Sequence, residues 1–205
     1  MSSYDVKARY IAADTASASA VSVSTSATVT ATGGFTLTAT GGVVFTAARI
    51  ITATTAGTSD GGKVVTITGT NINGAVQTED ITLASSATTV SGTRYFKSVT
   101  AATIDTTTTG NVALGNGAGA ADVVTAGRTR IQNVNLVDSA AAGVITFRNT
   151  MTSGDVKMQI GTTSSAANQT DIVIPGRGVL FEDGAYVTYT GGSSPVFTSV
   201  TVFYE

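Results

Sequence analysis

The segment IVIPGRGVLFEDGAY, residues 172–186, brings together the residue types that could perform chemistry: an arginine, two adjacent carboxylates and several glycines. Glu182 and Asp183 are of the type used in glycoside hydrolysis, which needs two carboxylates facing one substrate about 5 to 9.5 Å apart. Neighbouring residues of a strand point to opposite faces of a sheet. In a regular strand this pair therefore cannot act together, whereas in a turn it could converge. The same reasoning applies to Glu79 and Asp80.

The glycines of this segment do not form a phosphate-binding loop. The segment lacks the Lys-Ser/Thr ending of that motif, and a strand-like stretch rather than a helix follows it. Turns account for its small residues, because Pro175 and Gly176 can end one strand and Gly178 permits a tight entry into the next. Arg177 is not explained by these turns, and we expect it at a subunit interface.

Residue types essential to many enzymes are missing from the chain, which has neither histidine nor cysteine. Without histidine there is no general base of the usual kind near neutral pH, and the commonest zinc ligand is absent. Without cysteine there are no disulfides and no thiolate chemistry. We therefore expect no catalytic residues, no cofactor and no metal site.

The charge pattern argues against two classes of partner. Eleven basic residues balance thirteen acidic ones, for a net charge of −2, and no block of like charges occurs. A nucleic-acid binder usually carries a basic stripe, and a membrane-spanning helix needs about 18 apolar residues in succession. We expect neither partner, and we expect synthesis in the cytoplasm. With only 12% charged residues, the surface suits burial in an assembly.

Apolar and polar residues alternate along much of the chain, as in AVSVSTSATVTA and KVVTITGT, and this period of two predicts half-buried strands. Glycine-rich turns separate these stretches. Asn73 and Gly74 give the clearest hairpin signal, because both residues tolerate the positive φ of a tight turn. The predicted fold is all-β, with two small antiparallel β-sandwich or barrel-like domains.

A Gly/Ala-rich stretch, GNGAGAADVVTAG at residues 115–127, interrupts the strand pattern and has the composition of a linker. It predicts a β domain at 43–117, a linker at 118–127 and a second β domain at 128–205. Residues 1–42 are expected to form an arm or an added β-hairpin. Aromatic residues are assigned to core or interface packing, and Tyr186 and Tyr204 join Arg177 as interface candidates.

Two blocks of the sequence resemble modules of tailed-bacteriophage virion proteins. The first contains ARIITATTAGTSDGGKVVTITGTNINGAVQTEDITL, SGTRYFKSVTAATI and GNVALGNG; the second contains RTRIQNVNLVDSAAAGVITFRN, DIVIPGRGVLFEDGAYVTY and VTVFYE. The second is similar to small structural modules of short-tailed and marine phages. Together the blocks span most of residues 43–205.

This resemblance implies a structural component of the virion, made in the host cytoplasm. The expected function is that of a capsid decoration or cement protein, which binds the outer surface of the phage major capsid protein and stabilises it. A homo-oligomer is expected, with a trimer favoured. The alternative is a tail or tail-fibre component involved in host attachment, and the third class is a carbohydrate-active enzyme.

Overall fold

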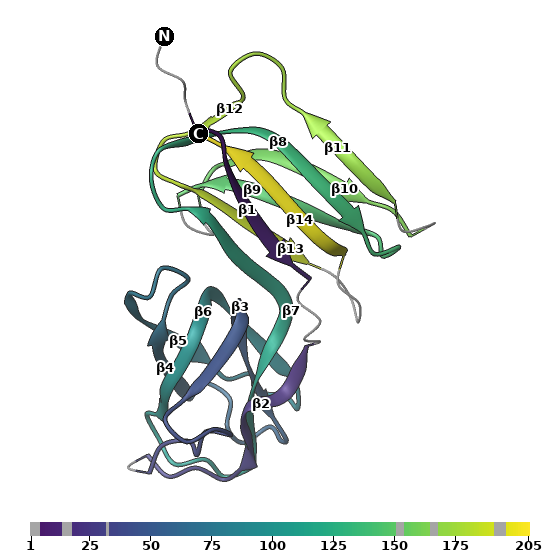
Figure 1. The fold of residues 1–205 in the computed structure, drawn as a ribbon. Coiled ribbons are helices and arrows are strands. Elements are labelled where there is room, and N and C mark those ends of the chain that lie inside the picture. Colours follow the sequence, from purple (N-terminus) through teal and green to yellow (C-terminus); the bar gives the residue numbers. More distant parts are fainter. Residues whose placement is uncertain (1–4, 14–17, 32, 151–153, 165–167, 191–195) are drawn as a thin grey trace. The chain divides into compact units, whose positions relative to one another are not determined.

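The computed structural model describes residues 5–13, 18–31, 33–150, 154–164, 168–190 and 196–205. Over these residues the fold is all-β, with fourteen strands and no helix (Figure 1). The all-β prediction is therefore confirmed. The described residues include no helix long and apolar enough to cross a membrane.

The strands form two antiparallel sheets. The five-stranded sheet has the order β1 (Lys7–Ala12), β14 (Phe197–Tyr204), β8 (Thr129–Asp138), β11 (Gln169–Val173), with β12 (Val179–Phe181) also paired to β8. The nine-stranded sheet has the order β10 (Val156–Thr162), β9 (Gly143–Asn149), β13 (Ala185–Thr190), β7 (Val112–Thr125), β3 (Val43–Thr55), β6 (Thr89–Ile104), β4 (Val64–Thr70), β5 (Val76–Thr82), with β2 (Ser19–Ala27) paired to β7. Both orders have open ends, so the barrel-like alternative is not what the structure adopts.

The chain divides into two compact units, one of which is inserted into the other. The inserted unit is Ser17–Ala120, and the terminal unit combines Met1–Ala16 with Ala121–Glu205. The beginning of the chain is therefore not a separate arm, because β1 pairs with β14 along its whole length. Strand β2 belongs to the inserted unit. The structure thus distributes residues 1–42 over both units.

The segment expected as a linker is a strand over most of its length. Residues 118–125 lie in β7, and the boundary between the units falls inside that strand, between residues 120 and 121. Ala120 and Ala121, on either side of that boundary, are buried. A Cβ at Gly115 would collide with the backbone oxygen of Ser19 on β2. Composition alone did not separate these two uses of glycine.

The inserted unit has its own apolar core. Along β4 every second residue is buried, which is the period that the sequence predicted. The largest fully buried side chains of this core include Phe96, Ile51 and Ile67. The segment between β2 and β3 also contributes to it, because the Phe35 N–H donates to the Ala102 carbonyl of β6 and the Phe35 side chain is buried.

The terminal unit packs its five-stranded sheet against β9, β10 and β13 (Figure 1). Its core contains the fully buried side chains of Phe147, Phe181 and Phe197. Tyr189 on β13 contacts Phe197 on β14 in an edge-to-face arrangement, with ring centroids 4.7 Å apart and an interplanar angle of 70°. This contact joins the two sheets within the unit, in a geometry that aromatic pairs prefer.

Candidate functional site

The first residues of β8 place cations on one face of the strand and core residues on the other. Thr129 and Ile131 are buried, whereas Arg130 and Gln132 are only half-buried and Arg128, just before the strand, is exposed. Residues two apart in a strand share a face. Arg130 and Gln132 therefore share the outer face of β8, and Arg128 lies just before the strand begins.

Strands β11 and β12 lie one after the other along the same edge of β8, and a loop separates them. Ile174 extends the β11 ladder by donating its N–H to the Gln132 carbonyl at 2.9 Å. Val179, the first residue of β12, is paired with Ile131, the very next position on β8. Residues 175–178 consequently have no partners on β8 and bulge out of the ladder.

This loop carries Arg177 and is held close to β8 by a glycine. Gly176 and Gly178 both adopt positive φ, 73° and 76°, which glycine reaches without steric cost. A Cβ at Gly178 would collide with the Ile131 carbonyl oxygen, whereas a Cβ at Gly176 would meet nothing. The close approach of the loop therefore requires glycine at 178, and it places the exposed Arg177 beside the outer face of β8.

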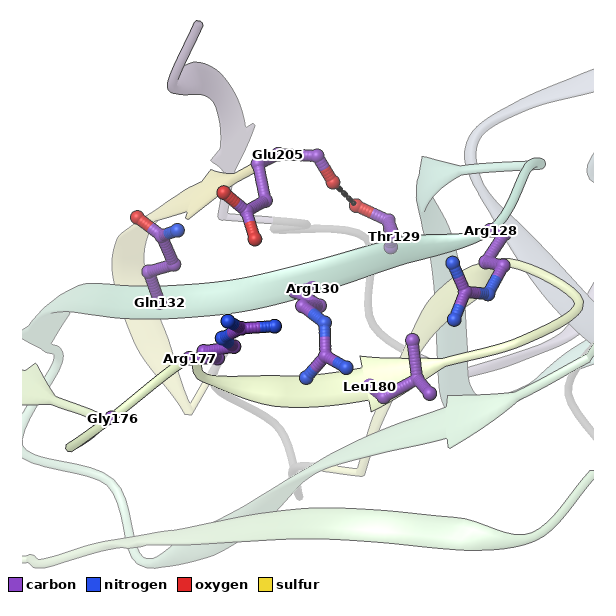
Figure 2. Close-up of a pocket in the computed structure, with 8 residues that line it drawn as sticks. All are labelled: Arg128, Thr129, Arg130, Gln132, Gly176, Arg177, Leu180 and Glu205. Atoms are coloured by element: carbon purple, nitrogen blue, oxygen red, sulfur yellow. Dashed lines mark hydrogen bonds between the residues drawn. The ribbon is translucent and has the colours of Figure 1, made fainter. Parts of the chain in front are cut away.

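Together these residues enclose a pocket of about 470 Å³, which we call the arginine pocket. Figure 2 shows the three guanidinium groups around the same depression, with Leu180 between the strands. Leu180 is paired directly with Arg130 across the β8–β12 ladder, so both side chains lie on the same face. The lining residues are Arg128, Thr129, Arg130, Gln132, Gly176, Arg177, Leu180 and Glu205.

The arginine pocket carries an excess of positive charge. In the part of the chain that the structure describes, ion pairs join Arg9 to Asp122 and Lys63 to Asp60, and none involves the pocket arginines. Glu205 is the only acidic residue among the lining residues. Its backbone is fixed to β8, because the Thr129 hydroxyl donates to the Glu205 carbonyl at 2.7 Å (Figure 2). Three arginines against one acidic residue make an environment that attracts anions.

The three interface candidates occupy different environments. Arg177 is exposed and lines the arginine pocket. Tyr186 on β13 is only 2% exposed, so it offers no exposed surface to a partner. It is paired with Arg148 and lies on the face of β13 opposite to Tyr189. Burial does not alternate along β13, because its residues from Ala185 to Tyr189 are all buried. Tyr204 on β14 is half-buried, paired with Ile131 on one side and Lys7 on the other.

The carboxylate pair of the opening segment lies in the turn between β12 and β13. Both Glu182 and Asp183 are exposed. The Asn149 side-chain oxygen accepts hydrogen bonds from both of their backbone N–H groups, at 2.6 and 3.2 Å. Asn149 thus fixes the backbone of this turn.

The second carboxylate pair, Glu79 and Asp80, lies on β5, where neighbouring side chains point to opposite faces. Glu79 on β5 is 9% exposed and accepts hydrogen bonds from the N–H of Thr93 at 2.5 Å, from its hydroxyl at 2.9 Å and from the N–H of Arg94 at 3.1 Å. Asp80 points to the other face, is exposed, and accepts from the Thr66 hydroxyl at 2.7 Å. Glu79 therefore accepts hydrogen bonds from β6, whereas Asp80 accepts one from β4.

Among the residues that the structure describes, Asp60 is the most deeply buried acid, with no exposed surface. Lys63 donates to it at 2.6 Å, and the N–H groups of Thr109 and Gly110 donate at 2.7 and 2.8 Å. Burial acts to raise its pKa, but these hydrogen bonds and the charge of Lys63 outweigh burial and hold the pKa of Asp60 below its ordinary value. Among the described residues, no group of three or more acidic side chains could hold a metal ion.

No protein-family model matches the chain, and a search of curated proteins found no relative. The site therefore has to be interpreted from its own geometry. Sequence reasoning selected Arg177 but missed Arg128 and Arg130, although their spacing of two within a strand-like stretch is visible in RTRIQ. What the spacing does not reveal is that Arg177 lies beside them, since that depends on how β11 and β12 pair with β8.

Proposed function

We propose that this protein is a non-enzymatic structural component of a tailed-bacteriophage particle, namely a capsid decoration or cement protein. It binds the outer surface of the major capsid protein and stabilises the shell. The proposal includes two small β-sandwich domains on one chain and assembly as a homo-oligomer, with a trimer favoured. It builds on the resemblance of both sequence blocks to virion modules.

The observation that best supports an assembled protein is the character of its open strand edges. Strands β1, β11, β10 and β5 end the two sheet orders. Large apolar side chains on three of them are well exposed: Tyr10 at 62%, Val173 at 72% and Val76 at 78%. Open edges with apolar side chains are surfaces on which other chains pair, and proteins that remain free in solution usually protect them.

The division into two compact units supports multivalent binding. Each unit has its own core and its own open edges. Contacts that are weak singly become strong when linked units, and then linked subunits, engage neighbouring sites on one surface. A repeating capsid lattice offers such sites.

The location of the protein in purified particles tests this function. Quantitative mass spectrometry should give a copy number in fixed proportion to the major capsid protein, and labelled antibody should cover the shell. Particles stripped of the protein should release their genome at a lower temperature, and adding the purified chain back should restore the original value. Label confined to the tail would instead support a tail or fibre component.

The enzymatic class is tested separately with host surface polysaccharide. We expect no chain cleavage on incubation with the purified protein. Cleavage that the Glu182→Gln variant abolishes would overturn the non-enzymatic assignment.

A further inference from the structure

We propose that the arginine pocket binds carboxylate side chains of an extended acidic peptide segment in a partner protein. Only the identity of that partner, a neighbouring protein of the particle, rests on the proposed function. The chemistry of the ligand rests on the pocket itself.

The pocket is lined by arginine side chains that form no ion pair within the described structure. Three of the eleven basic residues of the chain line it, and in the described part of the structure none of the three is ion-paired. Bringing guanidinium groups together is unfavourable until an anion neutralises them. All three are arginines, whose planar forks can each donate two parallel hydrogen bonds to one carboxylate. The ligand is therefore an anion with flat, bidentate acceptor groups.

The spacing of the cations matches an extended peptide. Arg128 immediately precedes β8 and Arg130 is the second residue of that strand, so their Cα atoms are at most about 7 Å apart. An extended peptide with acidic residues at alternate positions presents its carboxylates at the same interval. Arg177 adds a third cation from the loop, and Leu180 offers an aliphatic contact for the peptide's methylene groups.

A nucleic acid fits this pocket less well. No third cation follows Arg128 and Arg130 along β8, because the next residue on the face of Arg130 is Gln132. Glu205 adds a negative charge to the pocket, which a continuous phosphate backbone would have to approach. Nucleic-acid binders usually carry a long basic stripe, and this chain has a net charge of −2 without a basic block.

The pocket also lacks the aromatic side chains that commonly bind an anionic polysaccharide. Sugar rings are commonly bound against aromatic side chains, whose flat apolar faces cover the C–H groups of the ring. Within the described structure, the lining of the arginine pocket contains no aromatic residue. Peptide carboxylates are therefore the ligand that matches the cations, their spacing and Leu180.

Fluorescence anisotropy with the full chain tests the proposal. The probe is a fluorescein-labelled peptide of four Glu-Ser repeats, and Gln-Ser and Lys-Ser peptides of equal length are controls. We expect saturable binding of the Glu-Ser peptide alone, weakening as salt is added because exposed charges become screened. Removing one guanidinium by Arg130→Gln or Arg177→Gln should weaken binding about tenfold each.

Lys157→Gln is the matched control variant, because Lys157 is an exposed cation of the same unit outside the pocket. It removes the same charge and should leave the affinity nearly unchanged. Thermal unfolding of every variant checks the fold. If Arg130→Gln lowers stability, Arg177→Gln on the exposed loop still provides the test.

Three results would overturn the proposal. The first is absence of Glu-Ser binding at low salt, and the second is a loss of peptide affinity in Lys157→Gln equal to that in the pocket variants. The third is tighter binding of oligo-dT or heparin that the pocket variants abolish. The last result would reassign the pocket to a nucleic acid or a sulfated polysaccharide. The particle measurements separate this failure from that of the proposed function. A protein that covers the shell without binding the peptide refutes the pocket alone, whereas one that binds the peptide but is absent from particles refutes only the decoration role.

Discussion

Gly178 lies against the carbonyl oxygen of Ile131 so closely that a Cβ at position 178 would collide with it. This contact joins the loop between β11 and β12 to β8, and it is what places Arg177 beside Arg130. The two glycines of PGRG therefore have different roles. Both adopt positive φ, but only Gly178 makes the close approach.

Alanine substitutions at these two positions separate the roles. Gly176→Ala introduces only the cost of positive φ for an L-residue, about 1 kcal/mol. Gly178→Ala adds a steric collision, and we expect a loss of a further 1 to 3 kcal/mol or so in the free energy of unfolding. Urea denaturation measures both values. Equal losses in the two variants would show that the loop is not held by this contact.

Glu79 and Asp80 provide a second matched pair. Glu79→Ala leaves the N–H groups of Thr93 and Arg94 without their acceptor, and we expect a loss of about 2 to 4 kcal/mol. Asp80→Ala removes one exposed hydrogen bond to Thr66 and should cost less than about 1 kcal/mol. Chemical denaturation of both variants gives the comparison, and a similar cost for each would contradict the buried role of Glu79.

Asp60 should make the inserted unit sensitive to acid. Because its folded-state pKa is lowered, its contribution to stability is fully present above the unfolded-state pKa, about 3.9, and is lost as the pH falls through the folded value. We expect little pH dependence from Asp60 near neutrality and a decline below about pH 4. Unfolding curves from pH 7 downwards, compared with Asp60→Asn, measure this contribution. An identical acid-limb slope in the variant would disprove it.

The inserted unit should fold as an isolated fragment. All members of its core cluster lie between Val23 and Leu114, inside Ser17–Ala120. We expect that fragment to unfold cooperatively, since a domain of this length can bury a sufficient core. The fragment from Ala121 onwards lacks β1, which leaves the edge of β14 open, and we expect it to self-associate. Circular dichroism and light scattering test both expectations, and a fragment without a cooperative transition would contradict the first.

Local patterns allowed much of the fold to be predicted. The alternation in KVVTITGT identified β4, whose burial follows the predicted period, because side-chain direction in a strand repeats every two residues. The Asn73–Gly74 signal lies in the turn between β4 and β5, where Gly74 has a φ of 81°. In both cases the local structure is determined by residues only a few positions apart in the sequence.

Other features depended on contacts that no local pattern describes. The stretch around Gly115 has the composition of a linker, yet the backbone of β2 lies where a side chain would be. Tyr186 matched an interface residue by type, but the packing of its sheet buries it. Composition does not reveal which surfaces other segments cover.

The sequence by itself determined that the chain forms antiparallel strands and where several of them turn. Only the tertiary structure decided that the beginning of the chain joins β14, that one unit is inserted into the other, and that Arg177 completes the arginine pocket. The physical reason is the range of the interactions. Alternation and turn conformation are set by neighbouring residues, whereas strand pairing and register are set by the burial and hydrogen bonding of segments far apart in the chain.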